Sequence, residues 1–108
     1  MPDFRAMSAA DLREVVMIER ACVEFPWATA HFESSLRNEH SCQVLQLGQT
    51  VIAYAIVMFA ASEATLLNIC VAQEYQKQGY GEQMLSKMID IARHEKAESM
   101  FLEVRDSN

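Results

Sequence analysis

The chain has 108 residues, about half of them apolar, and its 15 acidic and 9 basic side chains give a formal charge of −6. This length suits one small domain, so we treat residues 1–108 as a single domain. The negative charge argues against binding to nucleic acid or to an anionic membrane, because both partners require a basic face. The longest apolar run, residues 51–61, is too short to span a bilayer, and we expect a cytoplasmic protein.

The first part of the chain predicts two helices. Residues 8–22 carry a one-sided apolar stripe, with Ser8 as the N-cap and Asp11 completing a capping box. Pro26 ends this pattern, because the residue before a proline avoids helical geometry. Residues 28–39 predict a second, shorter helix with Thr29 as its cap.

The following segments predict a sheet. Residues 41–47 alternate between apolar and polar, and a turn at 48–49 leads into a second strand over 50–61, so the pair predicts a hairpin. Residues 63–71 are almost all apolar, which indicates a central strand.

The last part of the chain predicts a helix over 79–98 and a strand over 99–104. Apolar side chains recur at helical spacing and are expected to face the sheet: Met84, Leu85, Met88, Ile89 and Ala92. The strand over 63–71, this helix and the last strand form a βαβ unit, which implies parallel strands and a right-handed crossover. The predicted order is therefore ααβββαβ, an α/β fold with a mixed sheet.

The cysteines and histidines give no indication of a metal site. Neither group has a spacing typical of metal ligands, and the odd number of cysteines argues against a complete disulfide set: Cys22, Cys42, Cys70, His31, His40 and His94. We interpret the cysteines as free, mostly buried thiols in a reducing compartment, and we expect no metal.

The junction between the strand over 63–71 and the following helix has the composition of a phosphate-binding loop. It reads Gln76-Lys77-Gln78-Gly79-Tyr80-Gly81. The N–H groups at a helix N-terminus bind anions, and glycines let a ligand approach the backbone closely. A Walker loop needs G-K-[ST], and a dinucleotide fingerprint needs a third glycine where Met84 stands. Neither motif is present, and a plain strand-to-helix turn is the alternative.

The pattern Q-x-x-G-x-G at residues 76–81 resembles the pyrophosphate-binding motif of the GNAT superfamily of N-acetyltransferases. Three further segments, 19–27, 63–71 and 102–108, resemble those of its ribosomal-protein-alanine N-acetyltransferases, so the resemblance runs the whole length of the chain. It implies a GNAT fold and acetyl transfer from acetyl-CoA to the N-terminal alanine of a ribosomal protein.

The resemblance also implies roles for individual residues. For acetyl-CoA binding it indicates the strand backbone and the loop, with a further contact near the reacting group: Ile69, Cys70, Val71, Gln76, Lys77, Gln78, Gly79, Tyr80, Gly81, Glu82 and Asn108. Glu103 corresponds to the general base, which takes the proton of the attacking amine. Phe25, Pro26 and Trp27 correspond to a loop that lines the peptide site. The alternatives are purely structural: a core strand, a surface glutamate, a hydrophobic staple between two helices and a C-terminal residue without a role.

Relatives in this family continue beyond the segment that ends in Asn108, with another helix and two strands that carry a general-acid tyrosine. The resemblance therefore implies an incomplete domain whose last strand leaves an exposed edge, through which two copies could pair as a dimer. Two alternatives stay open. One is a non-catalytic fragment or interaction module, and the other is an acetyltransferase for a different amine.

Overall fold

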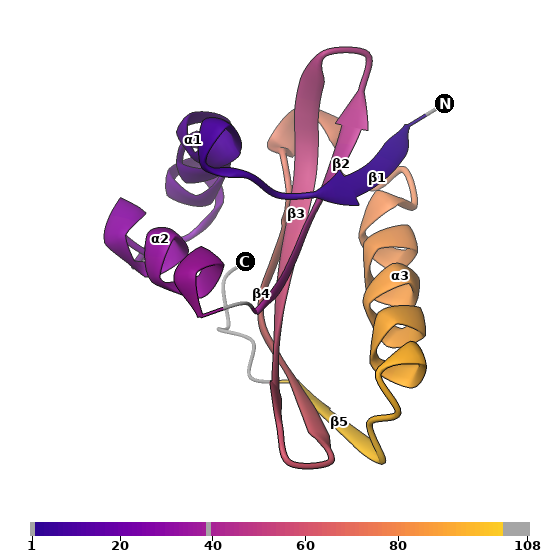
Figure 1. The fold of residues 1–108 in the computed structure, drawn as a ribbon. Helices are drawn as coiled ribbons and strands as arrows, with labels where there is room; N and C mark the ends of the chain where they lie inside the picture. The colour runs from indigo at the N-terminus through magenta and orange to yellow at the C-terminus, as the bar shows by residue number, and fades with distance from the viewer. Residues whose placement is uncertain (1, 39, 103–108) are drawn as a thin grey trace.

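The computed structural model describes residues 2–38 and 40–102, and it forms one five-stranded sheet between two layers of helices (Figure 1). The strands lie in the order β1-β2-β3-β4-β5. Their bounds are β1 Asp3–Ala6, β2 Ser41–Leu47, β3 Thr50–Ala60, β4 Glu63–Val71 and β5 Ser99–Leu102. The helices are α1 Leu12–Cys22, α2 Thr29–Arg37 and α3 Tyr80–His94, with short 3-10 turns η1 Ala9–Asp11 and η2 Gln73–Tyr75. Two predicted site residues, Glu103 and Asn108, lie outside the described residues.

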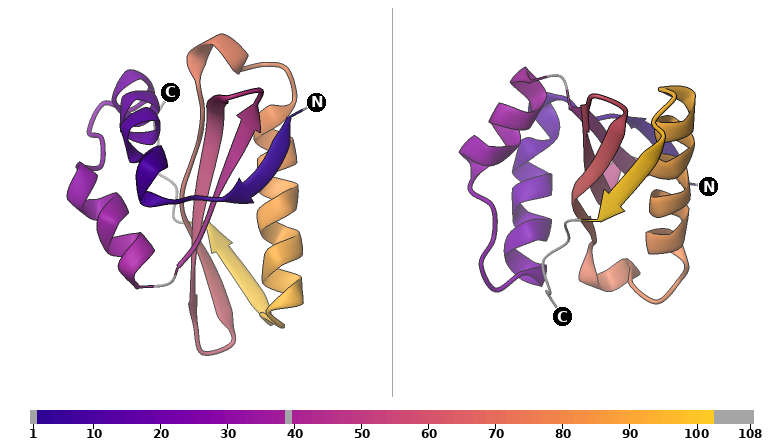
Figure 2. Two further views of the ribbon diagram at one scale, coloured as in Figure 1. Left: turned by 45° about the horizontal axis from the view of Figure 1, so that its top comes forward. Right: turned by 90° about the horizontal axis from the view of Figure 1, so that it is seen from below.

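The predicted mixed sheet is confirmed. β2 pairs antiparallel with β3, and β3 pairs antiparallel with β4. β4 and β5 are parallel, and α3 connects them as the crossover of a βαβ unit. Figure 2 shows α1 and α2 on one face of the sheet and α3 on the other.

The prediction that the chain begins with a helix is wrong, because a short strand precedes it. β1 pairs antiparallel with β2, from Asp3 opposite Gln46 to Ala6 opposite Gln43. This strand has four residues at the sheet edge and is mostly exposed. Only Phe4 is partly buried, so the strand lacks the repeated alternation from which strands are predicted.

The helix ends differ in detail from the prediction. The main-chain nitrogen of Ser8 donates to Asp11 Oδ2 at 2.8 Å, as a capping box requires, although the first turn is the separate 3-10 turn η1. Thr29 is not a cap: Ala28 takes the N-cap position of α2, and its N–H donates to His31 Nδ1 at 3.1 Å. α3 is shorter than residues 79–98, with Gly79 as its N-cap.

The core has one half on each face of the sheet, because β3 is buried on both. On the α3 face, Met84, Met88 and Ala92 are buried at helical spacing, as predicted. On the other face, Phe32 contacts Tyr54 edge-on at 5.7 Å between ring centroids. Each fully buried side chain of this size contributes roughly 1.5–3 kcal/mol to folding.

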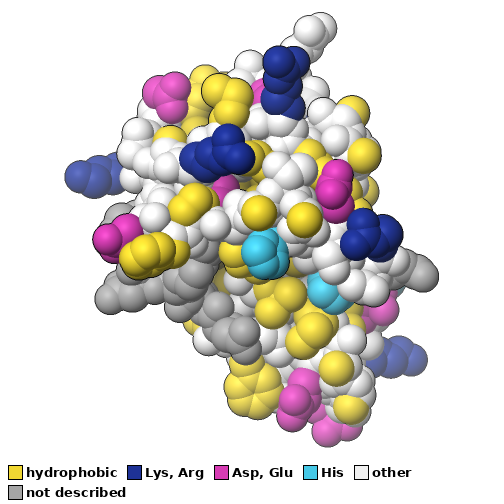
Figure 3. All heavy atoms as spheres, turned by 90° about the vertical axis from the view of Figure 1, so that its left-hand side faces the viewer, with side chains coloured by type: hydrophobic (Ala, Val, Ile, Leu, Met, Phe, Trp, Pro, Cys, Tyr) yellow, Lys and Arg dark blue, Asp and Glu magenta, His cyan; other side chains and the backbone are white. Residues whose placement is uncertain are grey.

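The surface over α1 and α2 carries charged side chains of both signs, scattered among apolar ones (Figure 3). Among the described residues, no helix has both the length and the apolar character that crossing a membrane demands.

Candidate active site

A bulge in β4 shapes the centre of the site. Asn68 pairs with Ile56 and Leu66 pairs with Val57, so Leu67 is an extra residue without a partner. Leu66 lies in the core on the α3 face, whereas Leu67 packs on the α1 face. Asn68 also reaches towards α1, where its side chain binds a helix residue. An extra residue bends its strand, so β4 turns at this point.

Beyond the bulge, one edge of β4 is open within the described part of the chain. β5 pairs with β4 only from Glu63 to Leu66. The main-chain nitrogen of Ala72 donates to Ile52 O at 2.8 Å, and bonding residues alternate along an antiparallel ladder. The peptide groups of Cys70 therefore face β3, and those of Ile69 and Val71 face the open edge.

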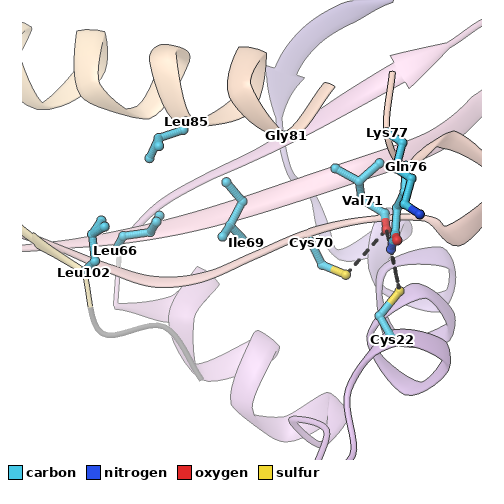
Figure 4. Close-up of a pocket in the computed structure, with 10 residues that line it drawn as sticks. All are labelled: Cys22, Leu66, Ile69, Cys70, Val71, Gln76, Lys77, Gly81, Leu85 and Leu102. Atoms are coloured by element: carbon cyan, nitrogen blue, oxygen red, sulfur yellow. Dashed lines mark hydrogen bonds between the residues drawn. The ribbon is translucent and has the colours of Figure 1, made fainter. Parts of the chain in front are cut away.

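A pocket of about 390 Å³ lies at this edge, between β4, β5, the start of α3 and the end of α1 (Figure 4). It is lined by Cys22, Leu66, Ile69, Cys70, Val71, Gln76, Lys77, Gly81, Leu85 and Leu102. Six of the residues predicted to bind the cofactor are in this lining. Gln78, Gly79, Tyr80 and Glu82 are not, and they lie beside it in the loop and the first turn of α3.

The loop that leads into α3 presents free main-chain donors beside the pocket. Within the described residues, the amides of Lys77 to Glu82 have no backbone acceptor. Gly79 has φ +89°, which strongly favours glycine, and a Cβ built there would meet no atom within 4 Å. Free amides at a helix N-terminus, with the Lys77 ammonium nearby, fit a pyrophosphate. The residues present therefore suit the phosphate end of a CoA ester.

The two glutamines of the loop hold the backbone in place. Gln76 Nε2 donates to Val71 O at 2.9 Å and lies 3.7 Å from Cys22 Sγ. Gln78 Nε2 donates to Glu74 O at 3.2 Å. The Gln76 side chain thus connects the end of β4 to the loop, a structural role beside the binding role predicted for this residue.

Glu19 on α1 organises the α1 face of the site, and sequence analysis missed it. Its side chain is fully buried. Oε1 accepts hydrogen bonds from Tyr54 Oη on β3 and from Asn68 Nδ2 on the β4 bulge, the latter at 3.0 Å. Oε2 accepts from the main-chain nitrogen of Trp27 at 2.9 Å. One carboxylate therefore joins α1, two strands and the loop after α1. Its position within the apolar stripe of the helix is the signal that could have identified it.

Of residues 25–27 in the loop between α1 and α2, one side chain packs against the core and two are exposed to solvent. The Trp27 ring packs against Phe32 at 5.0 Å and His31 at 5.8 Å between centroids. Pro26 is exposed, and the Phe25 side chain is 78% exposed. Trp27 therefore packs against α2, as the alternative of a hydrophobic staple between the two helices requires. Phe25 and Pro26 remain accessible to a ligand.

Burial governs the titration of the groups around β4. Burial, followed by the interaction with the neighbouring Cys22 thiol, raises the pKa of the Cys70 thiol to about 12. Burial and the hydrogen bond to Glu19 raise the pKa of Tyr54 above its ordinary value. Both groups therefore keep their protons near neutral pH.

An open strand edge that leads onto free amides at a helix N-terminus is the arrangement expected in the class of proteins that bind an extended, phosphate-bearing ligand. The chain matches the acetyltransferase (GNAT) family over residues 9–108. It is 34% identical over 109 residues to the [ribosomal protein bS18]-alanine N-acetyltransferase of Escherichia coli K12, covering 100% of this chain and 73% of that protein.

Solved structures of N-acetyltransferases have the same fold as this chain. The ribosomal-protein-S18-alanine N-acetyltransferase from Escherichia coli superposes with a TM-score of 0.91 at 32% identity, over 100% of this chain and 70% of that one. The PaiA N-acetyltransferase from Thermoplasma acidophilum, in complex with coenzyme A, has a TM-score of 0.71 at 16% identity, over 90% and 75%. This chain belongs to the acetyltransferase (GNAT) family. The predicted fold and the predicted class of enzyme are thereby confirmed.

Proposed function

We propose that the protein transfers an acetyl group from acetyl-CoA to the α-amine of an N-terminal alanine, in a ribosomal protein. The observation that carries this proposal is the open edge of β4 beyond the bulge, which runs directly onto the free amides before α3. The acceptor is inferred from the relative in Escherichia coli, whose name specifies ribosomal protein bS18.

The cofactor would lie along the pocket. The edge peptide groups of Ile69 and Val71 would pair with the pantetheine arm as a further strand does. The pyrophosphate would bind the amides of Lys77 to Glu82. A main-chain N–H at the edge would also polarise the thioester carbonyl, where negative charge develops during the reaction.

The acceptor would enter from the side of α1. Phe25, Pro26 and Trp27 would border its path, held by the hydrogen bond between Trp27 and Glu19. Glu103 would take the proton of the amine, since only the neutral amine attacks a thioester. The new amide bond forms as the carbon–sulfur bond breaks, and CoA leaves as a thiolate that takes a proton from water. Asn108 would contact the cofactor near the reacting group.

The first test is calorimetric titration of this chain with acetyl-CoA, followed by acetylation of an alanine-starting peptide. We expect saturable binding and a peptide product, and no product from a polyamine of similar charge. Saturable binding without any product would favour the non-catalytic module, and a polyamine product would favour the other-amine alternative.

The second test addresses the base. We expect Glu103→Gln to lower the turnover number by about 10²- to 10⁴-fold, the usual contribution of a general base, while leaving the affinity for CoA nearly unchanged. Equal losses of turnover and of affinity would contradict the assignment of Glu103.

A further inference from the structure

Two of the three cysteines meet at the pocket. Cys22 is the last residue of α1, and Cys70 lies in β4 beyond the bulge. Each Sγ atom lies 3.6 Å from the same acceptor, the carbonyl oxygen of Val71 (Figure 4). Both side chains line the pocket. The third cysteine, Cys42, is buried in β2, and its thiol donates to His40 O at 3.5 Å.

The two thiols share one acceptor. Because both sulfur atoms lie 3.6 Å from one oxygen, they are separated by at most twice that distance. The neighbouring Cys22 thiol is also one of the causes of the raised pKa of Cys70, which agrees with this proximity. A bond between them requires both side chains to turn away from the Val71 carbonyl and the sulfur atoms to approach to about 2.05 Å. Val71 O would still keep its hydrogen bond from Gln76.

We propose that Cys22 and Cys70 form a reversible disulfide that ties the end of α1 to β4 at the wall of the pocket. A low-molecular-weight disulfide, such as oxidised glutathione, is the oxidant. The Cys22 thiolate attacks one of its sulfurs, the sulfur–sulfur bond breaks and one thiolate leaves. The Cys70 thiol then loses its proton to solvent as its sulfur attacks the Cys22 sulfur, and the second thiolate is released. Two protein thiols are oxidised, the small disulfide is reduced to two thiols, and these carry the two protons.

The order of attack follows from the surroundings. Cys70 keeps its proton, because burial and the neighbouring thiol raise its pKa to about 12. Only the thiolate is nucleophilic, so Cys70 is a poor first nucleophile. Cys70 reacts second, when the mixed disulfide at Cys22 already lies beside it.

The cross-link would have two physical consequences. It closes a loop that contains α2, β2 and β3, and a disulfide across a long loop restrains the unfolded chain and so raises the melting temperature. It also fixes the end of α1, three residues before the exposed Phe25. If the pocket binds CoA as proposed above, bound CoA must cover both thiols and slow their oxidation.

The experiment uses the full chain and a Cys42→Ala variant, each treated with excess oxidised glutathione and then with dithiothreitol. We expect intact masses lower by two hydrogens, no retained glutathione, and full reversal. Trypsin cleaves after Arg20, Arg37 and Lys77, so the peptides 21–37 and 38–77 should be joined. The second peptide contains both Cys42 and Cys70, so fragment sequencing of the unsubstituted chain assigns the bond even if the variant does not fold. Cys22→Ala is the matched control and should not lose two hydrogens.

The outcomes are distinct. A Cys22–Cys70 bond and a melting temperature several degrees higher would support the proposal. A persistent glutathione adduct at Cys22, a bond through Cys42, or three thiols left free would overturn it. Adding saturating CoA then separates the two proposals: a disulfide that forms equally fast with CoA would keep the thiol pair but contradict the assignment of this pocket to the cofactor.

Discussion

Replacing Glu19 with glutamine tests whether one buried carboxylate holds the α1 face of the site together. The carboxylate accepts from Tyr54 and Asn68 at one oxygen and from the Trp27 main chain at the other. Glutamine has the same shape but offers only one oxygen. If that oxygen keeps Tyr54 and Asn68, the new amide points its own N–H groups at the Trp27 N–H, and that hydrogen bond is lost.

The expected magnitude follows from the burial of these groups. A donor that loses its acceptor away from water costs about 1–3 kcal/mol. In the opposite orientation the glutamine oxygen accepts from the Trp27 N–H, but its amide group then faces Asn68 Nδ2. One donor therefore loses its acceptor in either orientation. We therefore expect Glu19→Gln to lower the free energy of unfolding by about 1–3 kcal/mol.

The chain provides its own reporter, because Trp27 is the sole tryptophan. Urea unfolding followed by far-UV circular dichroism gives the loss of stability, and acrylamide quenching of Trp27 fluorescence in the folded state reports on the loop. We expect faster quenching in Glu19→Gln. Glu33→Gln, on the exposed side of α2, is the matched control and should stay within about 0.5 kcal/mol of the parent. Equal stability of the two variants, with unchanged quenching, would refute the reasoning.

Two further predictions concern the phosphate loop and the start of the chain. Gly79→Ala and Gly48→Ala should each cost about 1–2 kcal/mol in urea unfolding, because both glycines have positive φ, +89° and +63°. Only Gly79→Ala should also weaken the binding of CoA, and an equal effect from Gly48→Ala would contradict the placement of the pyrophosphate. Arg5 donates to both carboxylate oxygens of Asp11, at 2.8 and 2.7 Å, and this holds the pKa of Asp11 below its ordinary 3.8. A depressed pKa gives stability that is present above the unfolded-state value and lost as the pH falls through the folded-state value. The stability difference between the parent and Arg5→Gln should therefore shrink in acid, and a pH-independent difference would contradict this assignment.

Much of the fold was predictable because its signals are local. The apolar run of β3, the turn at Gly48 and the spacing of Met84, Met88 and Ala92 each depend on residues close together in the sequence. The strand β1 was not predicted for the same reason, since four mostly exposed residues at an edge are too few to show a periodicity. The loop at residues 76–81 was also found locally, because glycine and polar residues before a helix indicate an anion site.

The details of the pocket were decided by contacts between distant segments. A glutamate in a helix has the same sequence pattern whether it is solvated or buried. Only tertiary packing brings Glu19 to Tyr54, Asn68 and the main chain of Trp27. The bulge at Leu67 has no signature in its own residues, yet it directs Asn68 towards α1. The sequence shows three cysteines without a pairing pattern, and only the tertiary structure brings Cys22 and Cys70 to one carbonyl. The sequence by itself determined the elements and the loop chemistry, because these depend on neighbouring residues. The tertiary structure decided which side chains share the pocket, because that depends on how distant elements pack.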